Sequence, residues 1–559
     1  MGARDRLAAR VAGIGGAPAS LVFTPGVFQI GDASVAARLA AGRLRLAGVE
    51  VDLGDAADPW DVAPPTPEWE ASLHGFDWLD HYAASGAPWV REALAGWIHA
   101  WIARCGRGAG PGWKAEIAGR RAAAWARSGR RIVEQASPAD GRAFLRAFAR
   151  NVRFLRRRWR AAPQGLPRCR AVAGLVHGAL ALYGPADPRV DEAAEALAEA
   201  ARGLHADGAP SRAPEDLAIV FAVLVAARRA LGESGRMAAP AHEAALAALA
   251  ADIRALRHPD GSLVRAQGGG AGDEAAIDHS LALLEAPSGA RAEAPMGYRR
   301  IASGRAVVFL DAGPAPSAPT TGAPFLGLFS LEASFDREPI VVSCGPGARI
   351  GAQWRRPCRA AAAHSSLTFD EADAEAEEAA LALAPADIAS EVERDAGAVR
   401  LAAVHDGWLK RFGLTHRRSL TLASDGLDFR GEDRLEALGP GPRAAFDQAA
   451  GVGDRMRLPF TIRFHLHPDV EAELFLAGGA VRLRPPSGED WVMRQLGGAL
   501  NLEESVYLDE RRGAPRATKQ IVVRADAADY RGLVKWAFRR ADTHLRGKPA
   551  AAEAGSGGF

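Results

Sequence analysis

The spacing of apolar residues changes once along this chain, and that change constrains the fold more than any other feature. Before about residue 290, apolar side chains recur every three or four residues, the period of a helix with one buried face. Leu246, Leu249, Ile253 and Leu256 form one such stripe, which ends at a turn sequence containing Gly261. The first half is therefore predicted to be a series of helical hairpins, arranged as a bundle, a solenoid or a toroid.

After residue 295, short apolar runs alternate with polar residues, and Gly, Asp or Pro bounds each run. Turn signals return roughly every 8–15 residues, which predicts an antiparallel β-sandwich. The two textures together predict an α+β chain of two domains. Its segments are an irregular lead-in (1–65), a helical domain (66–290), a β-sandwich domain (295–545) and a disordered tail (546–559).

The bulk composition excludes several classes of protein. The chain has 559 residues, enough for two or three domains, and its net charge of +2 does not indicate a nucleic-acid partner. No run of about 18 apolar residues is present, so no membrane span is expected. The N-terminus lacks a clear signal peptide, which favours a cytoplasmic location. None of the four cysteines lies in a CxxC pair, so neither a zinc knuckle nor a redox motif is expected.

One predicted helix carries a regular row of arginines beside its apolar stripe. The row has the spacing of one helical face and can dock a polyanion, such as an acidic polysaccharide. The alternative is a solvated face whose partners lie elsewhere in the fold. The arginines in question are Arg142, Arg146, Arg150, Arg153, Arg157 and Arg160.

Tryptophan is concentrated early in the chain, with eight of the 13 within the first 125 residues. Indole rings can cover the apolar face of a sugar, but they are also large core residues. Trp97 and Trp101 are four residues apart on one predicted helix and are interpreted as core. Trp78, in the string LHGFDWLDHY, is a better candidate for the wall of a cleft, although core packing is at least as plausible there.

The histidines of the β half are the other candidate functional residues. His465 and His467 are two apart in FTIRFHLHP, so on a strand both side chains point the same way, as a metal or an anionic ligand requires. The alternative is a polar face of hydrogen-bonded histidines. His364, His405 and His416 lie on three further predicted strands. No phosphate-binding loop, HExxH or GxSxG motif is present, and the glycine-rich stretch 267–274 is interpreted as a loop.

Several strings in combination resemble the heparinase II/III-like proteins. They extend from about residue 20 to 540 and are densest in the β half. The strings are PEWEASLHGFDWL, ADGAPSRAPED, RHPDGSLVRAQGGGAGDEAAID, RAAAAHSSLTF, HDGWLKRFGLTHRRSLTL, GLDFRGEDRL and FTIRFHLHP. The resemblance implies an incomplete (α/α) toroid followed by a β-sandwich, with the active cleft between them.

The resemblance also implies an activity, the cleavage of an acidic, uronate-containing polysaccharide by β-elimination. Such a lyase neutralises the uronate carboxylate, removes the C5 proton and supplies an acid to the leaving oxygen. Carried onto this chain, the family pattern indicates His364, Arg212 and His465 as catalytic, with Arg212 neutralising a carboxylate. Trp78 and His74 join Arg212 as expected substrate-binding residues.

A divalent metal, zinc or calcium, is a further implication of the resemblance, since the β-domain of relatives often holds one. His364, His405 and His416 are the expected ligands, and no accompanying aspartate is identified. Relatives are also commonly exported, so a periplasmic location is the alternative to a cytoplasmic one. A monomer or a homodimer is expected.

The chain departs from the family pattern at the residues that carry the chemistry. Relatives often read DGGHxSRNP where this chain has Ala209 and Ala213 in place of the His and the Asn. None of its five tyrosines lies near 205–216, where true lyases carry one. The first hypothesis is a polysaccharide lyase, and the alternatives are a non-catalytic glycan-binding relative and a protein that serves cell-envelope polysaccharide without elimination. Convergence of Arg212, Trp78 and His364 on one open cleft favours the lyase, whereas burial of each one separately counts against it.

Overall fold

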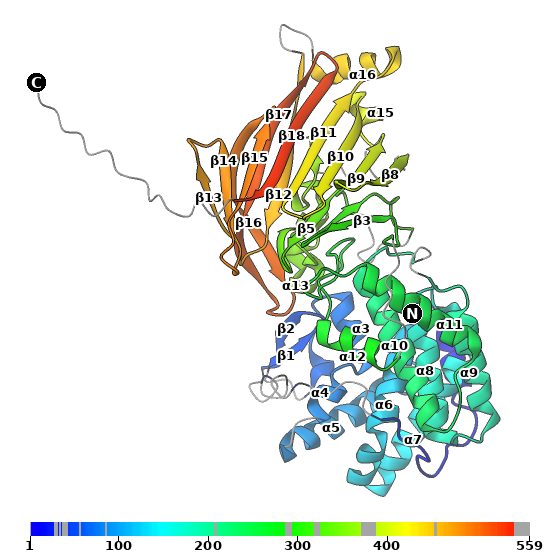
Figure 1. Ribbon diagram of the computed structural model, residues 1–559. Coiled ribbons are helices and arrows are strands. Elements are labelled where there is room, and N and C mark those ends of the chain that lie inside the picture. The colour runs from blue at the N-terminus through cyan, green and yellow to red at the C-terminus, as the bar shows by residue number, and fades with distance from the viewer. Residues whose placement is uncertain are drawn as a thin grey trace, which may run out of the picture.

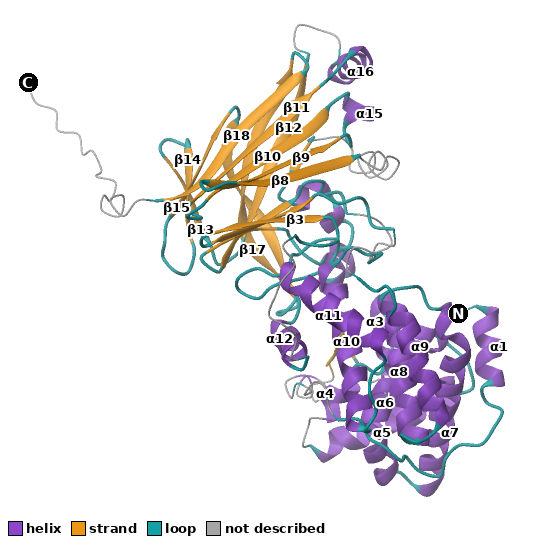
Figure 2. Cartoon of the chain, turned by 45° about the vertical axis from the view of Figure 1, so that its right-hand side comes forward, coloured by secondary structure: helices purple, strands orange, loops and turns teal. Residues whose placement is uncertain are grey.

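A computed structural model gives the arrangement of the chain as two unlike halves joined end to end (Figure 1). It describes residues 2–26, 32, 35, 38, 43–54, 58–83, 87–205, 209–284, 293–317, 325–369, 387–451 and 456–541. Figure 2 shows the helices gathered in one half and the long strands in the other. The prediction of a helical half followed by an antiparallel β half is confirmed. The predicted tail at 546–559 lies outside the described residues.

The helical half consists of consecutive antiparallel helices, most of which begin with proline. Proline suits the first turn of a helix because the amide hydrogen that it lacks has no partner there. The helices are α3 (Pro67–Gly75), α4 (Leu79–Ala83), α5 (Pro88–Cys105), α6 (Ala115–Gln135), α7 (Pro138–Arg158), α8 (Leu166–Tyr183), α9 (Pro188–Ala201), α10 (Pro214–Glu233), α11 (Pro240–Ala255) and α12 (Glu274–Ala282). Closure of these helices into a toroid stays a prediction.

The segment before α3 is more ordered than the irregular lead-in that was predicted. It contains helix α1 (Ala3–Val11), which packs on α7, and a hairpin of β1 (Arg43–Leu46) and β2 (Val49–Asp52). The hairpin turn reaches the β half, since a Cβ on Gly48 would lie only 1.6 Å from the backbone oxygen of Arg349. Gly48 has φ +80, which also favours glycine. The hairpin therefore belongs to the contact between the two halves.

Aromatic rings fill the core of the helical half around one buried arginine. Arg121 is fully buried, and its guanidinium lies 4.2 Å from the ring centroid of Trp101. It donates to the backbone oxygens of His74 and Gly112 and to the side-chain oxygen of Asn151. Burial lowers the pKa of Arg121 to about 9, because desolvation penalises a cation. The early tryptophans thus serve packing and hold a cation in place.

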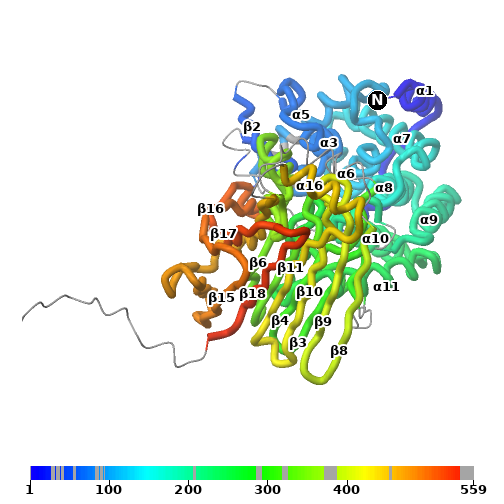
Figure 3. The backbone as a smooth tube through the Cα atoms, turned by 90° about the horizontal axis from the view of Figure 1, so that it is seen from above, coloured from blue at the N-terminus to red at the C-terminus, as the bar shows by residue number. Residues whose placement is uncertain are grey.

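Sixteen described strands of the β half form one continuous antiparallel network. Its long path runs β3-β4-β5-β6-β12-β17-β18-β11-β10-β9-β8, and Figure 3 shows β8 to β11 and β18 side by side. The strands are β3 (Tyr298–Ser303), β4 (Ala306–Asp311), β5 (Leu331–Phe335), β6 (Glu338–Val342), β7 (Leu367–Thr368), β8 (Ile388–Arg394), β9 (Ala398–His405), β10 (Thr415–Ala423), β11 (Asp428–Glu436), β12 (Arg457–Leu466), β13 (Glu471–Phe475), β14 (Ala480–Arg484), β15 (Trp491–Leu496), β16 (Ala499–Asp509), β17 (Ala514–Ala528) and β18 (Arg531–Arg540).

The network folds back on itself around an aromatic core. Phe335 of β5 stacks on Trp491 of β15 at 4.0 Å between ring centroids, although the two strands are far apart along the path. Division of these strands into the two sheets of a sandwich stays a prediction, because hydrogen bonds link all of them. Short helices decorate the loops, among them α13 (Gly347–Ile350), α15 (Leu409–Phe412) and α16 (Pro440–Ala450). None of the helices within the described ranges combines the length and the apolar character needed to cross a bilayer.

Candidate functional site

A large open cleft lies where the two halves meet, and we call it the seam cleft. Its volume is about 1280 Å³. The helical half contributes residues of α3 and α6, the start of α8, the end of α9 and the start of α10. The turn between β1 and β2, Leu249 of α11, the loop before α12 with the start of that helix, helix α13 and the turn between β16 and β17 also line it. A groove along the seam was expected, and the seam cleft has that position.

The seam cleft carries charges of both signs. Its described lining includes eight carboxylates, namely Glu68, Glu116, Glu199, Glu215, Asp216, Asp273, Glu274 and Glu510, and six arginines, namely Arg120, Arg168, Arg170, Arg202, Arg349 and Arg511. Most of these arginines are paired within the protein: Arg120 with Asp77, Arg170 with Glu116, Arg349 with Glu215 and Arg511 with Glu274. The cleft is therefore not the strongly cationic channel that a densely charged polyanion requires.

Two arginines of the lining are not engaged by a carboxylate at ion-pair distance. Arg168 donates to the backbone oxygens of Ala162 and Arg160. The side chain of Arg202 makes no hydrogen bond or ion pair within the part of the chain that the structure describes. The seam cleft therefore offers a small number of cations to a ligand that carries isolated carboxylates.

Arg212, the expected neutraliser of a substrate carboxylate, is buried and already paired. Its guanidinium forms an ion pair with Asp311 at the end of β4 and donates to the backbone oxygens of Met296 and Pro314. Only 7% of Arg212 is exposed. Its backbone oxygen also accepts from the hydroxyl of Tyr298, at 2.8 Å. Arg212 thus fastens the helical half to the β half, and its charge is compensated inside the protein.

His364 is buried near Asp311, the aspartate that pairs with Arg212. Its Nδ1 lies 3.4 Å from the hydroxyl oxygen of Ser343, and its ring meets that of Phe325 edge-on. Burial lowers the pKa of His364 to about 4, against the opposing fields of Asp311 and Glu332. The imidazole is therefore neutral at pH 7. Its Nε2 finds no partner among the described residues.

His465 and His467 do not form the expected pair on one strand. His465 is buried in β12, where its Nδ1 is 2.8 Å from the hydroxyl oxygen of Ser505 and its Nε2 is 2.9 Å from the backbone oxygen of Ala362. Burial lowers the pKa of His465 to about 3. His467 lies one residue beyond the end of β12 and lines a different cavity. For His465, the alternative of a hydrogen-bonded structural histidine agrees with the contacts.

Trp78 and His74 lie in the aromatic core of the helical half. Trp78 is 1% exposed, and its indole nitrogen donates to the backbone oxygen of Leu73. His74 is 8% exposed, and its Nδ1 accepts from the indole of Trp101 at 2.9 Å. Neither residue lines the seam cleft. Arg212, Trp78 and His364 are thus buried one by one rather than gathered on one open surface.

The expected metal ligands His405 and His416 form a hydrogen-bonded chain instead of a shared binding point. The amide of Gly407 donates to Nδ1 of His405, so Nε2 of His405 carries the proton and donates to Nδ1 of His416 at 3.0 Å. Nε2 of His416 then donates to Asp433 at 2.8 Å. A metal needs these nitrogens to face one common point, whereas here they face each other.

His364 does not join that chain. No group of three or more His, Cys, Asp or Glu side chains is placed to hold a metal ion within the described ranges. Asp433 is instead satisfied by His416, by the buried guanidinium of Arg418 and by the indole of Trp536. The described residues therefore do not fit the metal that the resemblance implies.

The arginine row on α7 finds most of its partners inside the protein. Arg150 donates to the backbone oxygen of Gly106, Arg153 to those of Ala12 and Gly16, and Arg160 pairs with Glu199. Arg157 donates to the backbone of its own helix. Arg142 and Arg146 have no partner in the described part of the chain. Arg160 is the one member of the row with an acidic partner among the described contacts, so the alternative of a solvated face with acidic partners elsewhere agrees with the contacts of that residue, while Arg150, Arg153 and Arg157 donate to backbone oxygens.

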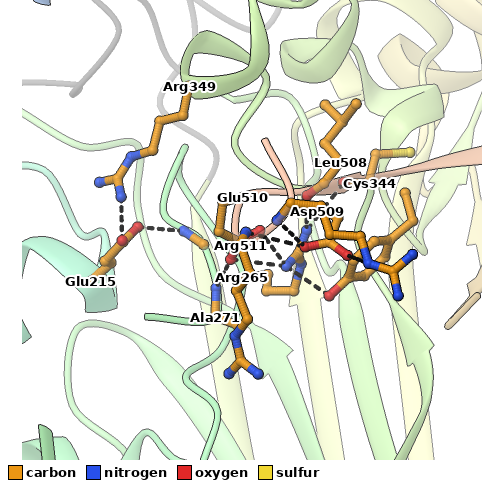
Figure 4. A network of polar contacts seen from close by, with 12 residues as sticks. Glu215, Arg265, Ala271, Cys344, Arg349, Leu508, Asp509, Glu510 and Arg511 are labelled. Carbon is orange, nitrogen blue, oxygen red and sulfur yellow. Dashed lines mark hydrogen bonds and ion pairs between the residues drawn. The ribbon is translucent and has the colours of Figure 1, made fainter. Parts of the chain in front are cut away.

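Several residues that hold the seam together were not anticipated from the sequence. Figure 4 shows Glu215 facing Arg349, and Glu510 facing Arg265 and the backbone of Ala271. The amides of Gly270 and Ala271, in the predicted glycine-rich loop, donate to Glu215 and Glu510 respectively. The signal for this role was the placement of Glu215 directly after the SRAP motif. Nothing local marks Glu510.

Comparison with known proteins identifies relatives over most of the chain. A family profile described as "Heparinase II/III-like, C-terminal" matches residues 286–537. FtsZ-localized protein C of Caulobacter vibrioides (strain NA1000 / CB15N) is 32% identical over 526 residues, which cover 90% of this chain and 88% of that protein.

Solved structures share the fold at low identity. Heparinase III has a TM-score of 0.69 at 13% identity, over 93% of this chain and 87% of that one. Heparan sulfate lyase HepC from Pedobacter heparinus has a TM-score of 0.56 at 13% identity, over 96% and 88%. Chondroitin AC lyase of Streptomyces coelicolor A3 has a TM-score of 0.54 at 12% identity, over 97% and 84%. These likenesses show a common architecture.

Proposed function

Because the chain belongs to the heparinase II/III-like family, we propose that it binds a glycan in the seam cleft without cleaving it by β-elimination. This is the non-catalytic alternative among the hypotheses from the sequence. The observation that carries the proposal is the buried ion pair between Arg212 and Asp311. An arginine whose charge is compensated inside the protein cannot also neutralise the carboxylate of a substrate.

The described part of the seam cleft also differs from the acid–base site that the resemblance implies. β-Elimination needs a proton acceptor and a proton donor within hydrogen-bond reach of one sugar ring. The described lining holds no tyrosine, and His205 is its single imidazole. His364 and His465 lie behind the seam among protein atoms. We therefore assign His364, His465 and Arg212 to the structure of the seam rather than to a reaction.

The charges of the lining indicate which glycan fits. Eight carboxylates beside six arginines repel a densely sulfated chain, while Arg168 and Arg202 can each meet one isolated carboxylate. A glycan with about one carboxylate per disaccharide and no sulfate matches this arrangement. The volume of the cleft, about 1280 Å³, exceeds that of an ordinary small-molecule pocket and suits several sugar units.

The experiment combines binding and elimination on one panel of glycans. Purified protein is titrated with hyaluronan, heparosan, alginate, chondroitin sulfate and heparan sulfate, and the near-ultraviolet absorbance of unsaturated uronate is followed in parallel. We expect binding of the unsulfated, sparsely carboxylated chains and no rise in absorbance. A steady rise in absorbance with any member overturns the non-catalytic assignment, and absence of binding to every member overturns the glycan assignment.

Matched variants locate the binding site. Arg168→Ala with Arg202→Ala is expected to weaken binding by roughly 10- to 100-fold, because each charge-assisted contact contributes about 1.5–3 kcal/mol at most. Arg142→Ala with Arg146→Ala also removes two exposed arginines, but from α7 outside the seam cleft. That control is expected to bind like the unaltered protein. Equal loss in both double variants would place the contact away from the cleft.

A second proposed role concerns location and partner. The name of the Caulobacter vibrioides relative states that it is localised with FtsZ, and the two chains match over 90% of this one. We propose that this protein also associates with FtsZ, which is compatible with service to cell-envelope polysaccharide without elimination. The test is co-sedimentation with FtsZ filaments of the same organism, supported by the overlap of fluorescent fusions in cells. Recovery only in the supernatant, with no overlap in cells, contradicts this role.

A further inference from the structure

A second, smaller pocket shares a wall with the seam cleft. We call it the Tyr507 pocket; its volume is about 420 Å³, and its lining includes His258, Arg265, His467, Tyr507 and Arg516. Glu274, Glu510 and Arg511 line both cavities. Figure 4 shows Glu510 and Arg511 of this shared wall beside Arg265. The two cavities are therefore neighbours, separated by a few side chains.

Buried ion pairs and hydrogen bonds fix the shape of the Tyr507 pocket. Arg265 is 4% exposed and donates to Glu510, to the backbone oxygens of Leu508 and Cys344, and to the hydroxyl oxygen of Tyr507. Its Nε has no partner among the described residues. A site whose polar groups are held in advance binds a ligand with little loss of side-chain entropy.

Tyr507 presents an unused hydrogen-bond donor to this pocket. Its hydroxyl oxygen accepts from Arg265 at 2.9 Å, so the hydroxyl hydrogen is left to donate. No acceptor for that hydrogen occurs in the described part of the chain. Burial raises the pKa of Tyr507 to about 12, and the hydroxyl therefore keeps its proton at neutral pH.

His467 places a second polar group beside the first. Its ring meets the ring of Tyr507 edge-on, at 5.1 Å between centroids. Burial lowers the pKa of His467 to about 4, so the ring is neutral. Nδ1 of His467 faces Asp469, whose backbone nitrogen lies at 3.4 Å and whose carboxylate oxygen lies at 3.6 Å. Nε2 of His467 has no hydrogen-bond partner among the described residues.

The charges around the pocket exclude an anionic ligand. Every arginine of the lining is paired, because Arg265 meets Glu510, Arg511 meets Glu274, and both Arg512 and Arg516 meet Asp509. Two further carboxylates, Asp469 and Glu332, are held by Arg516 and by His258. With no cation left over, burial of a carboxylate or a sulfate here lacks compensation. Hydroxyl and amide groups, by contrast, find both donors and acceptors.

From these contacts we infer that the Tyr507 pocket is an end subsite, which takes the uncharged terminal sugar of a glycan whose body lies in the seam cleft. The inference rests on the proposed function, because the seam cleft must bind that glycan. The two cavities connect if the ion pair of Arg511 and Glu274 swings aside. These side chains are 60% and 30% exposed, and exposed ion pairs are weak.

Two hyaluronan pentasaccharides of opposite phase test the inference, because they differ in the terminal sugar and carry two and three carboxylates respectively, so the Tyr507 and His467 variants separate the end preference from the charge difference. One carries N-acetylglucosamine at both ends, and the other carries glucuronate at both ends. The full-length protein is expected to bind the first more tightly by about 3- to 10-fold, the value of one or two hydrogen bonds to a neutral sugar. Tyr507→Phe and His467→Gln are each expected to reduce that preference. Tyr530→Phe, which removes a hydroxyl elsewhere in the β half, is the matched control and should keep it.

Each outcome separates this inference from the proposed function. Equal affinity for the two pentasaccharides, with both bound, overturns the end subsite and leaves glycan binding intact. A preference that survives both Tyr507→Phe and His467→Gln also overturns the subsite. If neither pentasaccharide binds, the proposed function fails and the end subsite fails with it. Thermal unfolding of each variant shows whether a lost preference reflects a lost fold.

Discussion

The seam between the two halves is built in two contrasting ways. On one side it is filled, since the buried ion pair of Arg212 with Asp311 joins the halves. On the other side it is open, as the seam cleft, where ion pairs lie at the surface and Arg168 and Arg202 meet no carboxylate at ion-pair distance. Arginine therefore joins the two halves where its side chain is buried, and it is available to a ligand where its side chain is exposed to solvent.

The two sides of the seam place different demands on charged side chains. A buried charge is costly unless it is paired, so the filled side of the seam must keep its partners together. An exposed charge costs little and can be exchanged for a ligand. The four predictions that follow probe this difference, from the filled side to the open side.

The largest effect is expected from Asp311→Asn, which leaves Arg212 buried without its counter-charge. Removal of one partner from a buried ion pair costs about 3–5 kcal/mol of unfolding free energy. Chemical denaturation followed by circular dichroism measures the loss. Asp311→Asn with Arg212→Met removes both charges and should recover part of it. If Asp311→Asn loses less than about 1 kcal/mol of unfolding free energy, the ion pair behaves like one at the surface. That result contradicts the burial of Arg212 with Asp311.

The next effect is a pH dependence set by His364. Burial holds its pKa at about 4 in the folded chain, whereas an unfolded histidine titrates near 6.5. Between these values the unfolded chain binds the extra proton, so the contribution of His364 falls as pH is lowered, by about 1.4 kcal/mol per pH unit. Below pH 4 both forms are protonated and the loss stops.

The measurement is unfolding free energy against pH from 7 to 4. His364→Gln should flatten the curve in that window. If unfolding free energy depends on pH in the same way for His364→Gln and the unaltered protein, the side chain of His364 is exposed to solvent rather than buried.

A smaller effect is expected on the open side from Arg202→Ala alone. The variant removes one cation without a partner from the lining of the seam cleft, and binding of hyaluronan is expected to weaken by roughly 10-fold. The unfolding free energy should stay within about 0.5 kcal/mol of its original value. Calorimetric titration and thermal unfolding measure the two quantities. If Arg202→Ala unfolds at a lower temperature yet binds hyaluronan normally, Arg202 stabilises the fold and does not contact the ligand, which contradicts its assignment to the open side.

The smallest effect is expected from Glu68→Gln, which breaks the ion pair with Arg355 at the rim of the seam. Both side chains are partly exposed, at 44% and 30%, so the pair contributes about 0–1 kcal/mol. The effect should shrink further in high salt, because ions screen exposed charges. A loss comparable with that of Asp311→Asn would remove the distinction between filled and open parts of the seam.

The sequence predicts the two halves well because the relevant signal is local. Three- and four-residue spacing specifies helices, and alternation specifies strands, without knowledge of distant partners. A buried contact can also be predicted from the sequence where the two strands are neighbours in the sheet. His405 lies opposite His416, and Arg418 lies opposite Asp433, in adjacent antiparallel strands. The ordered lead-in around β1 and β2 was missed because its hairpin depends on a contact with Arg349 in the other half.

The site was harder to predict, because exposure depends on residues far along the chain. Arg212 stands in a family motif, yet its burial follows from Asp311, 99 residues later. Trp78 looks like a cleft residue in its own string, but Trp97 and Phe76 pack on both sides of it. Tyr507 has no motif around it, and its importance rests on Arg265, which is 242 residues away.

Mass spectrometry of a recovered glycan tests the central claim most directly. The protein is incubated with an excess of a hyaluronan decasaccharide until binding has long been complete, and the bound and free chains are then weighed. The account predicts that every chain keeps its original mass. Elimination adds no water, so a pair of shorter chains whose masses sum to that of the decasaccharide would contradict it.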